Sequence, residues 1–137
     1  MKTVKSKNLK KSFATCINCM DGRVQEPSIR FLKKKFSVKY IDMITEPGAD
    51  KILAQYQAKA TIAAIKKKVQ ISIEKHNSKA IAIVGHHDCA GNPVSDTTHL
   101  RQIKKAVKNI SQWKLGVPVW GVWIDRHFRV EKVLSLK

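Results

Sequence analysis

Short apolar runs recur along the chain and predict its strands. Residues 13–17 and 79–84 are almost continuously apolar, which is typical of strands buried on both faces of a sheet. Residues 38–44 alternate between apolar and polar positions, and residues 119–124 form another apolar run. A further run at residues 128–134 follows a polar turn. The pattern therefore predicts five strands.

Amphipathic stretches between these runs predict helices. Pro27 suits the first turn of the first helix, because proline lacks the N–H that this turn leaves unpaired. Residues 50–76 carry apolar side chains at helical spacing and predict a long second helix. Its apolar stripe contains Ile62, Ile65, Val69, Ile73 and His76. A third helix is predicted over residues 96–113, and Gly116 and Pro118 follow it as helix breakers.

The order of these elements predicts the fold class. Strands that alternate with helices need crossover connections, which favour a parallel sheet covered on both faces. We therefore expect an α/β fold with a single-domain, mainly parallel sheet, helices on both faces and an antiparallel C-terminal edge strand. Residues 1–11 contain five lysines without apolar periodicity and predict a basic flexible N-terminal arm. The α/β domain then occupies residues 12–137.

Cysteine and histidine residues follow the first and third predicted strands. Cys19 comes after residues 13–17, and His86 with Cys89 comes after residues 79–84. In a doubly wound sheet these strands are commonly neighbours, and their carboxyl ends share one edge. Zinc prefers thiolate and imidazole ligands, and catalytic zinc sites keep a fourth position open. The sequence predicts one zinc ion per chain, although each of the three side chains could instead be a buried structural residue.

Two segments carry a resemblance to a known family. CMDGR at residues 19–23 and GHHDCAG at residues 85–91 resemble the two signature motifs of the β-class carbonic anhydrases, and the surrounding elements follow that family's order. The resemblance extends from Phe13 onward and implies a short, divergent member. It departs from the family's usual sequence at Gly22, where serine is usual, and at residues 45–50, where only one glycine is retained.

The resemblance implies an activity and a role for each site residue. Cys19, His86 and Cys89 are the implied zinc ligands, and Asp21 with Arg23 is the implied catalytic dyad. The implied enzyme is a carbonic anhydrase (carbonate dehydratase, a lyase), which catalyses reversible hydration of CO2 to bicarbonate through a zinc-bound hydroxide. Asp21 would orient that hydroxide, and Arg23 would keep Asp21 ionised. A homodimer or higher even-numbered oligomer is also implied.

Two rival functions and one plain structural interpretation stay open. The same zinc chemistry would suit a hydrolase of carbonyl sulfide or carbon disulfide. A non-catalytic zinc-binding protein with a basic, nucleic-acid-associated surface is the alternative from another class. Asp21 and Arg23 could also form an ordinary salt bridge.

Charge and hydropathy bear on partners and location. Lys and Arg total 27 against 10 acidic residues, which gives a net charge of +17. Such a surface attracts anions, but the sequence lacks RNA-binding or zinc-finger patterns, so nucleic acid is expected only through generic charge. No run of about 20 apolar residues is present, and no apolar stretch follows the basic start, which predicts no membrane partner and a cytoplasmic location.

Other cysteine and histidine residues receive more modest predictions. Cys16 lies inside a strand and predicts a buried thiol, although its CxxC spacing leaves a redox pair or an alternative ligand open. His87 either shuttles protons or points away from the site. His76 is expected to pack partly buried on its helix. His99 has no distinguishing context and is expected at the surface.

Overall fold

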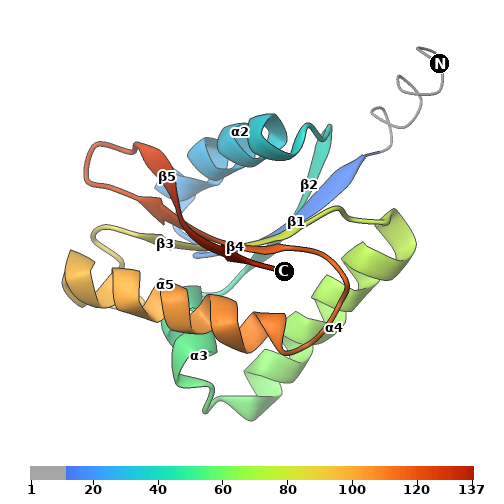
Figure 1. Cartoon of the computed structure of the whole chain (residues 1–137). Helices are drawn as coiled ribbons and strands as arrows, with labels where there is room; N and C mark the ends of the chain where they lie inside the picture. The colour runs from blue at the N-terminus through green and yellow to red at the C-terminus, as the bar shows by residue number, and fades with distance from the viewer. Residues whose placement is uncertain (1–11) are drawn as a thin grey trace.

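The computed structural model describes residues 12–137, so the predicted arm at residues 1–11 lies outside the described residues. Its strands are β1 (Phe13–Asn18), β2 (Tyr40–Thr45), β3 (Ile81–His86), β4 (Val119–Ile124) and β5 (Val130–Leu136). They form one sheet in the order β2-β1-β3-β4-β5 (Figure 1). The pairs β1–β2, β1–β3 and β3–β4 are parallel, and β4–β5 is antiparallel. The α/β fold and its C-terminal edge strand are thus confirmed.

Helices cover both faces of the sheet, as predicted. The short 3-10 helix η1 (Gly22–Val24) leads into α2 (Gln25–Phe36), which covers one face (Figure 1). The opposite face is covered by α3 (Ala49–Gln55), α4 (Lys59–His76) and α5 (Asp96–Ser111). Within residues 12–137, no helix is both long and apolar enough to cross a lipid bilayer. A cytoplasmic location stays a prediction from the sequence.

Side chains of β1 alternate between two separate apolar layers. Ile17 packs in the layer under α3, α4 and α5, together with Ile65 and Ile103. Cys16 points to the other layer, under α2, beside Leu32. Because apolar side chains pack against both faces of β1, the strand is buried along nearly its whole length, which explains its continuous apolar sequence. Cys16 is fully buried as a free thiol, which confirms the prediction, and this burial raises its pKa well above the usual range.

The predicted helix over residues 50–76 is wrong, because the chain breaks it into α3 and α4. Tyr56 ends α3 in the left-handed region, with a φ of 57°. Asn109 of α5 donates hydrogen bonds to the carbonyl oxygens of Leu53 (2.8 Å) and Ala54 (3.3 Å). Trp113 donates from its indole nitrogen to the Tyr56 hydroxyl at 2.7 Å. Asn109 of α5 thus satisfies carbonyl groups at the end of α3, and Trp113, just beyond α5, holds Tyr56, so the break depends on distant partners rather than on a local breaker.

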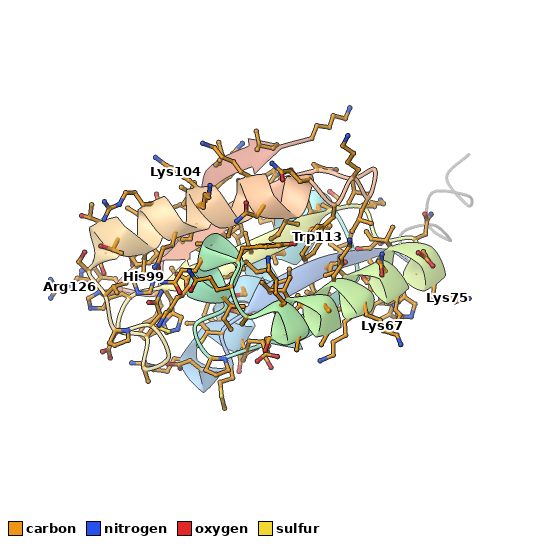
Figure 2. The ribbon with its side chains drawn as sticks, turned by 90° about the horizontal axis from the view of Figure 1, so that it is seen from below. Lys67, Lys75, His99, Lys104, Trp113 and Arg126 are labelled. Atoms are coloured by element: carbon orange, nitrogen blue, oxygen red, sulfur yellow. The ribbon has the colours of Figure 1, made fainter. Side chains whose placement is uncertain are left out.

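Basic side chains spread over the outer surface of α4 and α5. Lys67, Lys75 and Lys104 are exposed on this side of the molecule (Figure 2). Trp113, in contrast, lies between the helices, where it contacts Tyr56. The lysines are therefore distributed over a broad solvated face.

Candidate metal centre

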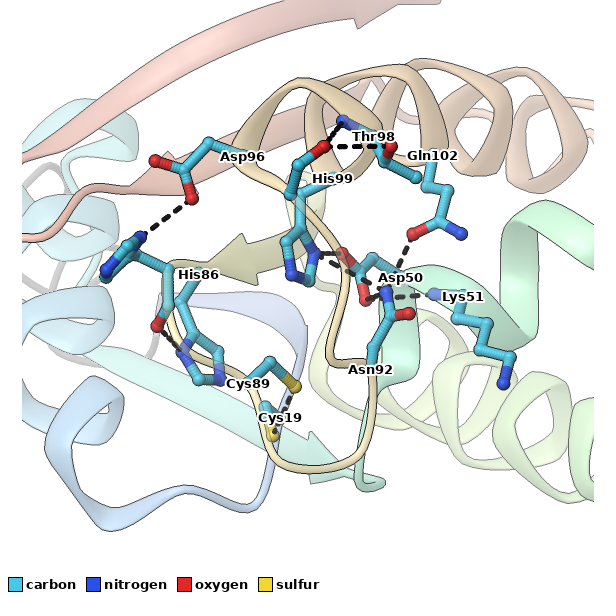
Figure 3. Close-up of polar contacts among 12 residues, drawn as sticks. Cys19, Asp50, Lys51, His86, Cys89, Asn92, Asp96, Thr98, His99 and Gln102 are labelled. Atoms are coloured by element: carbon cyan, nitrogen blue, oxygen red, sulfur yellow. Dashed lines mark hydrogen bonds and ion pairs between the residues drawn. The ribbon is translucent and has the colours of Figure 1, made fainter.

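The carboxyl ends of β1 and β3 bring the three predicted ligands together. The ligand atoms of Cys19, His86 and Cys89 all lie within 4.8 Å of one another, and all three residues are buried (Figure 3). The two sulfur atoms are 3.8 Å apart. This meeting follows from the parallel pairing of β1 with β3, which places strands distant in sequence side by side. Such a cluster can hold a metal ion.

The donor set fits a zinc ion. Two thiolate sulfurs that each lie about 2.3 Å from one tetrahedral zinc are about 3.8 Å apart, as the cysteine sulfurs are here. His86 uses Nδ1 to donate to the carbonyl oxygen of His87 at 2.8 Å. That bond leaves a lone pair on Nε2, which is buried and has no hydrogen-bond partner within residues 12–137. Burying such an atom is costly, and a metal ion would satisfy it.

The two thiols differ in acidity. Burial raises the pKa of the Cys19 thiol, but the His86 ring and the backbone N–H groups of Gly48 and Asp21 outweigh burial and lower this pKa to about 7. Burial and the neighbouring Cys19 raise the pKa of Cys89 to about 11. One thiolate is thus accessible near neutral pH, and a second negative charge beside it calls for a cation.

Side chains around β1 hold the Cys19 loop in place. Asn18 is fully buried and accepts from the Cys19 backbone N–H at 2.8 Å. Its amide nitrogen donates to the hydroxyl of Ser28 at 3.0 Å. Gln25 donates to the carbonyl oxygens of Cys19 and Asp21, both at 2.8 Å. Sequence reasoning missed Asn18 and Gln25, whose only signal is their polar character beside a ligand loop.

Asp21 and Arg23 form a close ion pair beside the cluster. The Arg23 guanidinium donates through Nη2 to Asp21 Oδ2 at 2.7 Å and through Nε to Oδ1 at 3.1 Å. The hydrogen bonds from Arg23 lower the pKa of Asp21 to about 2, despite an opposing contribution from burial. Arg23 also donates to the carbonyl oxygen of Asp88 at 3.0 Å. The same guanidinium therefore links the loop after β1 to the loop after β3.

Two glycines allow the loop after β2 to touch the loop after β3. A Cβ atom on Gly48 would lie 2.6 Å from the carbonyl oxygen of Gly91, and one on Gly91 would lie 2.7 Å from the Gly48 nitrogen. Gly48 also has a φ of 66°, which favours glycine. The loop after β2 thus packs directly against the loop that carries Cys89.

His99 corrects a prediction, because it is fully buried rather than at the surface. It lies on the inner side of α5, 5.5 Å from the Trp123 ring between centroids, and its Nδ1 is 2.6 Å from Asp50 Oδ2 (Figures 2 and 3). Asp50 is also buried, and Asn92 donates to it at 3.1 Å. Sequence reasoning missed this polar cluster, because its members come from three separate segments.

A surface cavity borders the loop that carries Cys89. It has a volume of about 570 Å3, and Cys89, Val94 and Asp96 contribute to its wall. His87 also faces it, half-exposed, and its Nδ1 lies 2.7 Å from Asp96 Oδ1. A role for His87 in proton transfer stays a prediction.

Solved structures with a similar fold are carbonic anhydrases. A carbonic anhydrase from Glaciozyma antarctica has a TM-score of 0.57 and 13% identity, with 92% of this chain and 83% of that one covered. The β-carbonic anhydrase CafA of Aspergillus fumigatus has a TM-score of 0.49 and 14% identity, with coverages of 96% and 78%. Tetrameric β-carbonic anhydrases of Sordaria macrospora give 0.45 and 15%, with coverages of 99% and 87%. The first of these supports the assignment of the fold.

The sequence itself matches a family model over almost its full length. No curated protein sequence matches the chain. The model of the family described as "Putative carbonic anhydrase" matches residues 9–134. That range includes both candidate ligand loops, the strands β1 to β4 and all of β5 except its last two residues. The chain therefore belongs to this carbonic anhydrase family, as a divergent member.

Proposed function

We propose that the chain binds one zinc ion through Cys19, His86 and Cys89 and catalyses the reversible hydration of CO2 to bicarbonate. The observation that carries the proposal is the buried cluster of three ligand atoms within 4.8 Å, beside the Asp21–Arg23 ion pair. When bound, zinc supplies a Lewis acid that lowers the pKa of a coordinated water to about 7. Membership of the carbonic anhydrase family supports CO2 as the substrate.

In this proposal Asp21 is the residue that orients the attacking oxygen. Arg23 donates to Asp21 from its backbone nitrogen, Nε and Nη2, and Nε is within hydrogen-bond distance of both carboxylate oxygens. In the proposed reaction the carboxylate that Arg23 holds in this way accepts a hydrogen bond from the attacking oxygen and so aims its lone pair at the carbon of CO2. Arg23 fixes the carboxylate and, through Asp88, ties it to the loop that carries Cys89.

Exposed apolar residues around the site support a second proposal, an even-numbered assembly that covers it. Met20 next to Cys19 is 63% exposed, and Phe128 is 47% exposed. Phe128 and Arg23 line a hollow of about 330 Å3. Exposed apolar side chains beside a site favour contact with a partner surface. Light scattering on the purified chain should give a dimer or a multiple of it; a monomer at micromolar concentration would contradict this.

Metal analysis and stopped-flow kinetics test the main proposal. The purified chain should contain one zinc ion, and zinc should be lost in Cys89→Ser. Zinc-loaded protein should accelerate CO2 hydration, and Asp21→Ala should lower the rate while zinc is retained. Zinc-loaded protein with no rate above buffer would overturn the activity. Hydrolysis of carbonyl sulfide without CO2 hydration would assign the site to the rival hydrolase.

A further inference from the structure

We propose that Asp50, His99 and Asn92 are positioning residues that hold the ligand loops in the geometry zinc requires. This inference rests on the zinc site of the proposed function. It does not depend on which molecule the zinc centre converts. The three residues form a buried polar cluster between α3, α5 and the loop after β3 (Figure 3).

Asp50 is the centre of this cluster. It lies in the first turn of α3 and is only 2% exposed. Its Oδ2 accepts from His99 Nδ1 at 2.6 Å, and its Oδ1 accepts from the amide nitrogen of Asn92 at 3.1 Å and from the Lys51 backbone N–H at 2.9 Å. A buried carboxyl group is costly unless it is hydrogen-bonded. These contacts therefore fix its position.

Asn92 connects Asp50 to the loop that carries Cys89. Its backbone N–H donates to the carbonyl oxygen of Cys89 at 3.2 Å and closes the turn between them. Its side-chain nitrogen has two hydrogens, one directed to Asp50 and one to Gln102 Oε1 at 2.7 Å. Both donors are thus used, and the turn after Cys89 is anchored to α3 and α5 together.

The start of α3 also touches the segments that carry the other two ligands. Gly85 precedes His86, and a Cβ atom on Gly85 would lie 2.7 Å from Asp50 Oδ2. Asp50 therefore packs directly against the backbone beside His86. In the same segment, the Glu46 backbone N–H donates to the carbonyl oxygen of Asn18, the residue before Cys19, at 3.1 Å. One short segment thus contacts all three ligand segments.

His99 connects Asp50 to α5. Its ring is fully buried between α5 and Trp123, and it supplies the shortest of the hydrogen bonds to Asp50. A carboxylate accepts this bond, so the shared proton belongs to Nδ1. Removal of the ring would free the carboxyl group to turn, and the loops that rest on Asp50 would lose their fixed spacing.

Zinc affinity measured by chelator competition on the full chain tests this role. Partners that orient metal ligands typically change metal affinity about 10–100-fold, so we expect His99→Leu to weaken zinc binding at least tenfold. His99→Asn keeps a donor near the position of Nδ1 and should restore most of the affinity. In cobalt-substituted protein, His99→Leu should shift the sulfur-to-cobalt absorption bands.

A matched pair at the other end of the sheet provides the control. His76 Nδ1 also lies 2.6 Å from a carboxylate, Asp42 Oδ2, but within residues 12–137 the contacts of that pair are with Ser72 and Phe13 rather than with a ligand loop. His76→Leu should leave zinc affinity and the cobalt spectrum unchanged. A folded His99→Leu protein with unchanged affinity and spectrum would overturn the proposal.

A milder variant keeps the test decisive if His99→Leu fails to fold. Gln102→Leu removes one of the two acceptors of the Asn92 side chain, so we expect a smaller loss of zinc affinity from a stable protein. Unchanged zinc affinity in that variant would also overturn the proposal. Wild-type protein that binds zinc without hydrating CO2 would contradict only the proposed activity.

Discussion

Two histidine–carboxylate pairs of equal length occupy opposite ends of the same sheet. At the carboxyl end, His99 and Asp50 are 2.6 Å apart, with side chains 0% and 2% exposed. At the amino end, His76 and Asp42 are also 2.6 Å apart, but their side chains are 44% and 26% exposed. The bond is the same in both places, so any difference in function must come from what surrounds it.

The surroundings differ in what they connect. The amino-end pair continues into a chain of hydroxyls, in which Ser72 donates to Asp42 at 2.7 Å and contacts Thr15 at 2.6 Å. His76 is more exposed than predicted, and its ring stacks on Phe13 at 4.1 Å between centroids. These contacts join α4 to β1 and β2. The carboxyl-end pair instead joins α3 and α5, through Asn92, to the loop that carries Cys89, so the same bond lies beside the candidate metal centre.

The largest expected contrast is in stability. Asp50→Ala leaves two buried donors unsatisfied, one on His99 and one on Asn92, and each such group costs about 1–3 kcal/mol. We therefore expect metal-free Asp50→Ala to lose about 2–6 kcal/mol of unfolding free energy by urea denaturation. A loss below 1 kcal/mol would show that water reaches this cluster and that the two ends are alike.

Zinc should stabilise the protein only if the three candidate ligands at the carboxyl end of the sheet are intact. At a zinc concentration 1,000 times Kd, the free energy of unfolding should rise by about 4 kcal/mol. Cys89→Ser should lose this gain, whereas His76→Leu should keep it in full. Thermal unfolding with and without zinc measures the gain. An equal zinc effect in wild type and Cys89→Ser would indicate binding elsewhere.

Alanine substitutions at two glycines distinguish the loss of stability caused by overpacking from the loss of zinc affinity. Gly85→Ala would push against Asp50 and Ile103, whereas Gly121→Ala would push against the apolar side chains of Ile103 and Val107. Overpacking costs about 1–3 kcal/mol, so both variants should be destabilised. Only Gly85→Ala should also weaken zinc binding, as measured by chelator competition. Equal affinities in the two variants would mean that Asp50 tolerates displacement.

The smallest effect is expected at the amino end. Partly exposed ion pairs contribute about 0–1 kcal/mol, so Asp42→Asn should change the free energy of unfolding by no more than this. Its zinc affinity should equal that of wild type. A loss comparable to that of Asp50→Ala would remove the distinction between the two ends.

The sequence was most informative where local pattern decides structure. The apolar character of β1 and β3 follows from burial on both faces, so their positions and parallel pairing were predictable. The three candidate ligands were predictable because residue type and strand end coincide at Cys19, His86 and Cys89. Their role in zinc binding stays a proposal.

Features that depend on distant partners were not predictable. Tyr56 ends α3 where Asn109 of α5 donates to the carbonyl oxygen of Leu53 and Trp113, beyond the end of α5, donates to the Tyr56 hydroxyl, and no local breaker marks that point. His99 looked like a surface residue, because its partner Asp50 is 49 positions away in the sequence. Polar side chains are buried where distant partners satisfy their hydrogen bonds, so periodicity alone cannot identify which polar residues are buried.

The candidate metal centre depends on the pairing of β1 with β3, because its residues follow these two strands. Cys19 and Cys89 are 70 residues apart in the chain, and the helices α2, α3 and α4 and the strands β2 and β3 lie between them. Loops of this length form contacts late, because their closure entropy must be overcome first. A nascent chain on the ribosome therefore cannot assemble the cluster until residue 89 has emerged. Tight zinc binding by these three residues would then indicate that β1 and β3 have paired.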